Sequence, residues 1–88
     1  MYQVILSNKA EKQLGKLERP LQERIVTALE RIRIRPEAYI TKLVGEQLYK
    51  FRVGDYRIII DIDQGLLRIL VVKIAHRKNV YDYSKLHK

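Results

Sequence analysis

Apolar residues in the first third of the chain recur with the period of a helix. Residues 2–6 are short and β-rich, and Asn8 followed by Glu11 is a helix-start signal, because each side chain can satisfy the other's backbone N–H. Pro20 suits the first position of a second helix, and Pro36 is expected to end it. The apolar face of the first helix consists of Ala10, Leu14 and Leu17, and that of the second consists of Leu21, Ile25, Ala28, Leu29 and Ile32. The two helices are predicted to form a hairpin.

From Leu48 onward the apolar period changes to two, which is typical of strands. Gly54-Asp55 matches a two-residue turn with glycine first. That turn pairs Val53 with Tyr56, Arg52 with Arg57, Phe51 with Ile58, Lys50 with Ile59, and Tyr49 with Ile60. Gln64-Gly65 predicts a second tight turn, which would place Asp61 opposite Arg68, Ile60 opposite Ile69, and Ile58 opposite Val71.

Both predicted hairpins divide the sheet into the same two faces. The apolar face, which the helices must cover, consists of Tyr49, Phe51, Val53, Tyr56, Ile58, Ile60, Leu67, Ile69 and Val71. The other face carries Lys50, Arg52, Arg57, Asp61 and Arg68, with Ile59, Leu70 and Val72 among them. The prediction is an α+β fold of order β-α-α-β-β-β, in which a helical hairpin packs on one face of a small, mainly antiparallel twisted sheet. Residues 1–88 are expected to form a single domain.

The formal net charge of +8 indicates which classes of partner the protein could bind. Surplus positive charge raises affinity for polyanions, so nucleic acid, an acidic protein or anionic lipid are compatible partners, with lipid the least favoured. The chain has no cysteine, which excludes disulfides, thiolate metal sites and a thiol nucleophile. The apolar run Val4-Ile5-Leu6 is too short for a signal peptide or a membrane span, so we expect a soluble, cytoplasmic protein that begins at Met1.

One group of residues on the polar sheet face suggests chemistry. Arg52 and Arg57 are expected to lie opposite each other with Lys50 one step along, and like charges so placed destabilise a sheet. A solvated strand face is the plainer explanation for each residue alone, whereas the three in register favour an anion site, and a phosphate suits arginine. After the last strand, His76, Arg77 and Tyr81 supply groups that could move protons or stabilise charge. Asp61 and Asp63 are too few for a convincing magnesium site, and we expect no metal or cofactor.

These segments resemble a known toxin superfamily. Residues 48–60 (LYKFRVGDYRIII), 72–77 (VKIAHR) and 80–81 (VY), together with the order of elements, are similar to the RelE/ParE toxins, and to the RelE-like branch in particular. The resemblance implies a ribosome-dependent endoribonuclease that needs no metal. In such an enzyme the 2′-hydroxyl of the mRNA attacks the adjacent phosphate and leaves a 2′,3′-cyclic phosphate and a 5′-hydroxyl.

The resemblance also implies roles for individual residues. Lys50 and Arg52 match two basic residues near the scissile phosphate, and Arg57 matches an arginine that stabilises the transition state. Arg77 matches a basic residue near the leaving oxygen, and Tyr81 matches a tyrosine that acts as a base or stacks on the substrate. The full candidate sets are Lys50, Arg52, Arg57, His76, Arg77 and Tyr81 for catalysis, and Lys50, Arg52, Arg57, Arg68, Lys73 and Lys78 for RNA binding.

Two departures leave the proton-transfer roles open. Arg52 stands where the best-known branch has a lysine, and an arginine is a poor proton donor. His76 is not catalytic in that branch, although related branches use a histidine. Because few residues follow Tyr81 in the sequence, we also expect no long C-terminal helix of the kind that some members carry.

The expected partners are the ribosome with its mRNA and an acidic, RelB-like antitoxin, with no membrane. The toxin alone is expected to be a monomer that forms a larger complex with the antitoxin. Two other functions remain open: a ParE-like inhibitor of DNA gyrase without RNase activity, and an RNA-binding module without catalysis.

Overall fold

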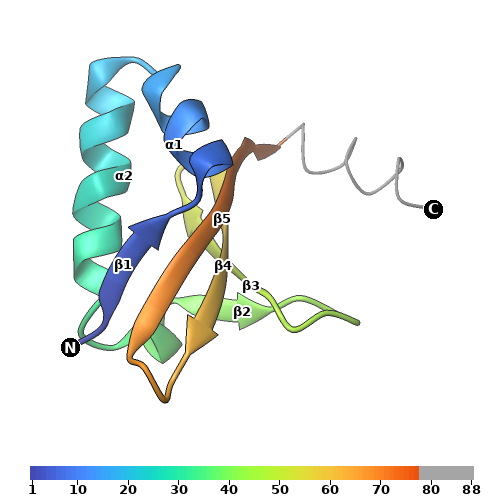
Figure 1. Ribbon diagram of the computed structural model, residues 1–88. Coiled ribbons are helices and arrows are strands. Elements are labelled where there is room, and N and C mark those ends of the chain that lie inside the picture. Colours follow the sequence, from blue (N-terminus) through green and yellow to red (C-terminus); the bar gives the residue numbers. More distant parts are fainter. Residues whose placement is uncertain (78–88) are drawn as a thin grey trace.

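In residues 1–77, which the computed structural model describes, five strands form one sheet and two helices pack on one of its faces (Figure 1). The elements are β1 (Gln3–Leu6), α1 (Asn8–Gly15), α2 (Arg19–Ile32), the short 3₁₀ helix η1 (Pro36–Ala38), β2 (Ile40–Lys42), β3 (Tyr49–Val53), β4 (Tyr56–Asp63) and β5 (Arg68–His76). The strands lie in the order β1-β5-β4-β3-β2. β1 is parallel to β5 and the other pairs are antiparallel, so the predicted α+β class is confirmed.

The helix boundaries differ from the prediction by a few residues. The side chain of Ser7, one residue before Asn8, caps α1 by accepting a hydrogen bond from the Ala10 N–H at 3.0 Å. A serine oxygen at this position satisfies an N–H of the first turn by itself, so the Asn8–Glu11 pair is not the cap. Pro20 is the second residue of α2 rather than the first. The helix ends at Ile32, and Pro36 opens η1 instead.

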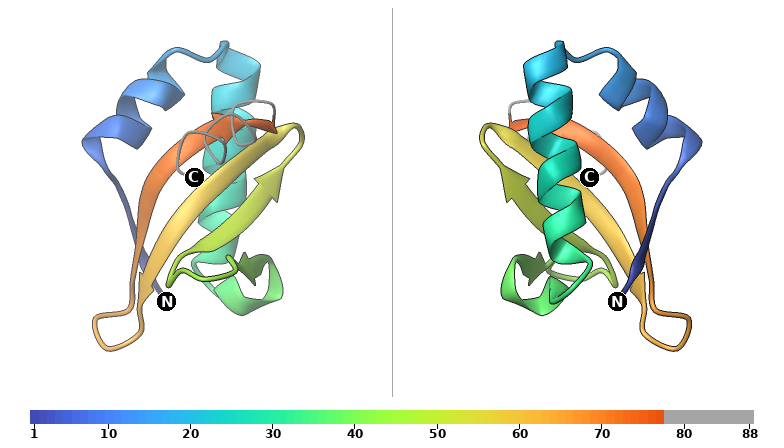
Figure 2. Two further views of the ribbon diagram at one scale, coloured as in Figure 1. Left: turned by 90° about the vertical axis from the view of Figure 1, so that its right-hand side faces the viewer. Right: turned by 90° about the vertical axis from the view of Figure 1, so that its left-hand side faces the viewer.

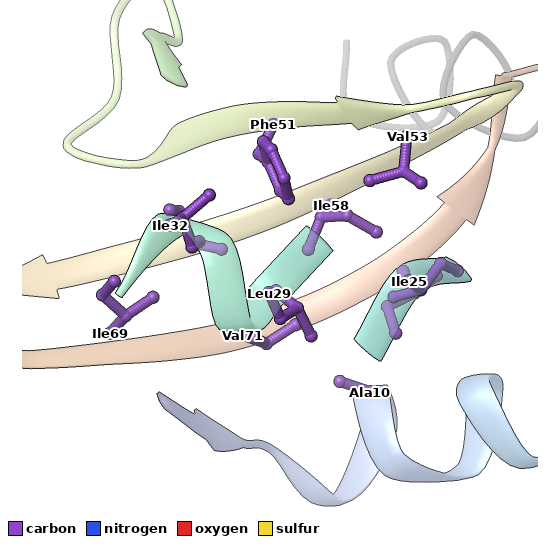
Figure 3. Packing of buried hydrophobic residues seen from close by; sticks show 11 residues of the cluster. Ala10, Ile25, Leu29, Ile32, Phe51, Val53, Ile58, Ile69 and Val71 are labelled. Carbon is purple, nitrogen blue, oxygen red and sulfur yellow. The ribbon is translucent and has the colours of Figure 1, made fainter. Parts of the chain in front are cut away.

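The core lies between α2 and the sheet. Ile25, Leu29 and Ile32 point from α2 toward the sheet, as Figure 3 shows. The buried residues that they meet are Phe51, Val53, Ile58, Ile60, Ile69, Val71 and Ile74, and Ala10 adds the contact from α1. Complete burial of one isoleucine contributes about 1.5–3 kcal/mol. This layer therefore holds the sheet rigid behind any site on its other face.

The first predicted hairpin is confirmed at every position. β3 and β4 pair Arg52 with Arg57, Lys50 with Ile59, and the remaining residues in the expected register. Gly54 has a φ of +59°, a left-handed conformation that glycine adopts without strain. The short turn therefore sets the register of the two strands that carry the basic residues.

The second hairpin is not the one predicted. Residues 64–67 form a longer loop, so Asp63 rather than Asp61 lies opposite Arg68 and Ile60 pairs with Val71. The Leu66 N–H bonds to the Asp63 carboxylate at 3.0 Å, which stabilises the loop. Leu67, expected in the core, lies in this loop with a φ of +50° and is 47% exposed. Because leucine rarely adopts a positive φ, the sequence did not indicate that the loop extends beyond Gln64-Gly65 to Leu67.

A β-bulge in β5 changes which residues face which side. Ile60 pairs with Val71 but Ile59 pairs with Lys73, so Val72 is an extra residue. Without the bulge, simple alternation assigns Val72 to the polar face and Lys73 to the core. With it, Lys73 lies in the same row as Ile59 and Lys50 on the polar face.

α1 holds the bulged part of β5. β1 pairs with β5 only through Val71, which leaves the following edge of β5 without a strand partner within residues 1–77. The Ser7 hydroxyl donates to the Val72 carbonyl at 2.6 Å, and the Ile74 N–H donates to Gln13 Oε1 at 2.7 Å. The side chains of Ser7, which caps α1, and of Gln13 within α1 thus replace hydrogen bonds of the missing strand ladder.

No helix within residues 1–77 is both long enough and apolar enough to cross a membrane.

Candidate active site on the basic face of the sheet

Three neighbouring strands bring four cationic residues together on the side of the sheet turned away from α1 and α2. Their neighbours along the strands, such as Phe51 and Ile58, are buried under the helices, so alternation directs these residues to the other side. We call this set the basic face: Lys50 and Arg52 on β3, Arg57 on β4, and Lys73 on β5. Figure 2 shows this side of the sheet in its left view and the helical side in its right view.

The strand register arranges the basic face in two rows. One row runs Lys50–Ile59–Lys73 and the next runs Arg52–Arg57–Ala75. Directly opposed residues have Cβ atoms about 4.5–5.5 Å apart, and diagonal neighbours about 7–8 Å. Arg57 lies opposite Arg52 and diagonal to both Lys50 and Lys73, so the other three cations are arranged around Arg57 on one area of the sheet.

Burial differs within the basic face. Arg52 is exposed, whereas Lys50, Arg57 and Lys73 are half-buried. Ile59, between the two lysines, is only 5% exposed. Burial lowers the pKa of the Lys73 ammonium below its ordinary value of 10.5, the positive charge of Lys9 lowers it further, and Glu46 opposes the shift. Lys73 therefore gives up its proton more readily than an ordinary lysine.

Arg77 lies at the end of the basic face. Its backbone N–H donates to the Asp55 carbonyl at 2.8 Å, which attaches the end of β5 to the β3–β4 turn. Arg77 is exposed and follows Ala75, the cross-strand partner of Arg57, by two residues. The turn therefore brings a fifth cation close to Arg52 and Arg57, although Arg77 is far from them in sequence.

The structure separates two candidates from this group. His76 pairs with Tyr56 on the helical side of the sheet, where the two rings meet edge-on at 5.2 Å and line a small pocket with Leu21 and Arg24. The bulge causes this, because one extra residue reverses the faces of all later residues in β5. Arg68 pairs with Asp63, six residues along β4 from Arg57 and thus about 20 Å away. Neither His76 nor Arg68 joins the basic face.

Lys78 and Tyr81 lie outside the described residues. Within residues 1–77, no group of three or more histidine, cysteine or acidic residues is placed to hold a metal ion.

The chemistry of the basic face suits a phosphate. Its cations can hold a phosphate by several charge-assisted hydrogen bonds and can stabilise extra negative charge that develops on it.

One residue near this site was missed by the sequence analysis. The Arg24 guanidinium from α2 lies against the β3–β4 turn, with Nη1 3.2 Å from the place where a Cβ on Gly54 would lie. Arg24 is one of several polar residues on a helix surface, and its position depends on how α2 crosses the sheet. No pattern in the sequence distinguishes it from Arg31 or Arg19.

Comparison with known proteins supports the resemblance. The family model for the ParE toxin of the type II toxin–antitoxin system parDE matches residues 4–81. No protein with a curated description matches the sequence.

Solved structures of RelE proteins share the fold. The archaeal RelE–RelB complex from Pyrococcus horikoshii OT3 contains a chain 26% identical, with a TM-score of 0.75 over 86% of this chain and 94% of the other. A RelB–RelE complex from Methanococcus jannaschii contains a chain that is 26% identical, with a TM-score of 0.72 over 90% of this chain and 96% of the other. The RelBE2 complex from Mycobacterium tuberculosis contains a chain that is 24% identical, with a TM-score of 0.79 over 86% of this chain and 98% of the other. With nearly its whole length matched by the family and its fold shared with RelE, this chain belongs to the ParE toxin family of type II toxin–antitoxin systems, within the RelE/ParE superfamily.

Proposed function

We propose that this toxin is a ribosome-dependent, metal-independent endoribonuclease that cleaves mRNA. The observation that carries the proposal is the basic face, on which Lys50, Arg52, Arg57 and Lys73 converge on three adjacent strands. Opposed like charges cost stability in a sheet, and a sequence tolerates such a cost mostly where the charges bind something. A phosphate that develops extra charge during a reaction fits this arrangement.

The proposed reaction uses a nucleophile that the RNA already carries. The 2′-hydroxyl loses its proton to a base while its oxygen forms a bond to the adjacent phosphorus. The bond from phosphorus to the 5′-oxygen breaks, and that oxygen takes a proton. The products are a 2′,3′-cyclic phosphate and a 5′-hydroxyl. The protein must therefore orient the phosphate, stabilise its added charge and transfer two protons.

Each residue has a proposed role in this scheme. Lys50 and Arg52 hold the scissile phosphate, and Arg57 stabilises the charge of the transition state. Arg77 lies toward the leaving oxygen, and Tyr81 acts as the base or stacks on the substrate base. Lys73 contributes binding charge beside Lys50. An arginine remains protonated at any relevant pH, so the proton donor is sought among the lysines rather than at Arg52 or Arg57.

We further propose that an acidic, RelB-like antitoxin neutralises the toxin. The solved structures with the same fold include complexes of RelE with RelB, and a formal charge of +8 favours an acidic partner. In this proposal the toxin alone is a monomer, forms a larger complex with the antitoxin and acts in the cytoplasm, where the ribosomes are.

A second function has one observation in its favour. The family model that matches is that of ParE toxins from parDE systems, and a ParE-like toxin would inhibit DNA gyrase without cutting RNA. The basic face favours the RNase, because it concentrates cations around a phosphate-sized site rather than spreading them over a docking surface.

The test is a cleavage assay on ribosomes programmed with mRNA, with RNA ends mapped by primer extension. Wild-type protein should cut mRNA on the ribosome and leave free RNA intact, with no metal added beyond what the ribosome requires. Arg57→Ala should lose about 100-fold or more of the rate, the usual loss for a group that stabilises transition-state charge. Arg68→Ala is the matched control, because it removes the same charge from the remote end of the sheet and should keep the rate. Intact mRNA together with inhibited supercoiling of DNA by gyrase would replace this proposal with the second one.

A further inference from the structure

A groove runs between α2 and the outer edge of β3. It encloses about 600 Å³, and its lining consists of Pro20, Glu23, Arg24, Thr27, Ala28, Arg31, Tyr39, Phe51, Arg52, Val53 and Gly54. The groove exists because β2 pairs with β3 only as far as Phe51, so the edge at Arg52 and Val53 has no neighbouring strand within residues 1–77. Among its lining residues, Arg52 alone has a proposed catalytic role.

The groove is positively charged. Arg24 and Arg31 lie seven residues apart on one stripe of α2, which corresponds to two helical turns and about 10 Å. Arg52 adds a third cation from the sheet side. Glu23 is the acidic residue of the lining, and its carboxylate lies 3.9 Å from Arg19 Nε. In the described part of the chain, no acceptor lies within hydrogen-bonding distance of the Arg24 or Arg31 guanidinium.

An exposed aromatic ring lies among these cations. Tyr39 is 45% exposed and lines the groove. Its ring meets that of Phe51 edge-on, with centroids 6.3 Å apart and an angle of 76°, so a core residue holds it in place. A half-exposed ring in a groove that arginines also line is the combination with which proteins stack the bases and bind the phosphates of single-stranded nucleic acid.

The groove is continuous with the basic face. Arg52 belongs to both, because it lies on β3 just beyond the last residue that pairs with β2 and also donates from Nε to the Gly54 carbonyl at 3.4 Å. Arg24 contacts the same turn from the helical side. Cations therefore follow a path from Lys50 and Arg57 around the edge of β3 to Arg24 and Arg31.

We propose that this groove binds single-stranded RNA, with Arg24 and Arg31 on its phosphates and a base stacked on Tyr39. The proposal deepens the proposed function, on which it rests, because the RNA would be the mRNA strand that continues beyond the phosphate held on the basic face. An acidic peptide is the competing occupant. It is disfavoured because a peptide helix or strand needs a row of accessible apolar pockets. In this groove Phe51 and Val53 are buried in the core, and the residues that α2 exposes along it include Arg24, Thr27 and Arg31.

Direct binding tests the groove separately from cleavage. A fluorescently labelled RNA of about 12 nucleotides is titrated with the full chain, and anisotropy gives Kd at several salt concentrations. A ribosome-dependent enzyme leaves this free RNA intact. The double variant Arg24→Ala/Arg31→Ala should weaken binding about tenfold or more and reduce the slope of log K against log salt by about 1.4, since each phosphate contact on a single strand contributes about 0.7. Tyr39→Leu should weaken binding about fivefold or more, with the salt slope unchanged, because stacking carries no charge.

The matched control is the double variant Lys12→Ala/Arg35→Ala. It removes two positive charges from exposed residues that do not line the groove, and should weaken binding less than threefold. Equal losses in the two double variants would overturn the proposal, because they would show a general effect of net charge. The proposal would also be overturned if Arg24→Ala/Arg31→Ala kept full RNA binding but lost binding to an acidic antitoxin peptide.

The two proposals fail in different ways. If the groove variants bind RNA as tightly as the wild type while the wild type cleaves mRNA on the ribosome, the groove proposal alone is wrong. If the wild type binds RNA through Arg24 and Arg31 but leaves mRNA intact on the ribosome, the RNase proposal alone is wrong.

Discussion

Arg52→Gln should make this protein more stable and less active at the same time. Arg52 lies directly opposite Arg57 across β3 and β4, and Lys50 precedes it by two residues on the same face. It is exposed, and the bond from its Nε to the Gly54 carbonyl is long at 3.4 Å. Glutamine keeps much of the side-chain length and removes the charge, so the substitution mainly relieves repulsion.

The size of the effect follows from these positions. Two unit charges about 7 Å apart in water repel by about 0.6 kcal/mol. At 10 mM salt the Debye length is about 30 Å and most of this remains, so the two neighbours together should cost about 1 kcal/mol. At 1 M salt the Debye length is about 3 Å and the cost should nearly vanish. For a domain of this size, 1 kcal/mol corresponds to about 4–8 °C in Tm.

Urea titrations at 10 mM and 1 M salt measure this directly, because urea carries no charge. Arg68→Gln is the control: Arg68 lies opposite Asp63, so the same substitution removes an attraction and should lower the free energy of unfolding by about 0.5 kcal/mol or less at low salt. In the ribosome assay, Arg52→Gln should lose about 100-fold of the rate, whereas Arg68→Gln should not. A loss of stability in Arg52→Gln at 10 mM salt, or a gain that persists unchanged at 1 M, would refute the reasoning.

Three further predictions concern the elements that support the basic face. Gln13→Leu should lower the free energy of unfolding by about 1–3 kcal/mol, because it leaves the half-buried Ile74 N–H without its acceptor; hydrogen exchange of that amide should accelerate relative to the core of β4. Gly54→Ala should cost about 1 kcal/mol or more, measured by thermal unfolding, because φ is +59° and the new Cβ would press on the Arg24 guanidinium. Lys73→Met should be more stable than wild type at neutral pH, because burial lowers the pKa of Lys73 and so penalises its charged form. That advantage should be constant below the lowered pKa and shrink as pH rises from there through 10.5, above which wild-type Lys73 is neutral in both states. An advantage that grows with pH in paired urea titrations would contradict the prediction.

The local patterns of the sequence were sufficient for the parts of the fold that local physics decides. The stripe of Ile25, Leu29 and Ile32 predicted which side of α2 is buried, because apolar residues at helical spacing must lie against a core. Gly54-Asp55 predicted the register of β3 and β4 completely, because a two-residue turn allows only one pairing. The opposition of Arg52 and Arg57 follows from that turn alone.

Tertiary contacts decided the rest. β2 is only Ile40–Lys42, too short to show alternation, and it exists because β3 offers it a partner. The bulge at Val72 depends on Ser7 and Gln13, more than 60 residues from the backbone groups that they bind. That bulge moved Lys73 onto the basic face and His76 off it. The alternation of residues along a strand indicates which face of the sheet each side chain occupies only while the strand pairing is regular. Whether the pairing is regular depends on the elements that pack beside the strand. The sequence therefore determined by itself the helices, the first hairpin and three members of the basic face. Only the fold determined the fourth member and the groove beside it.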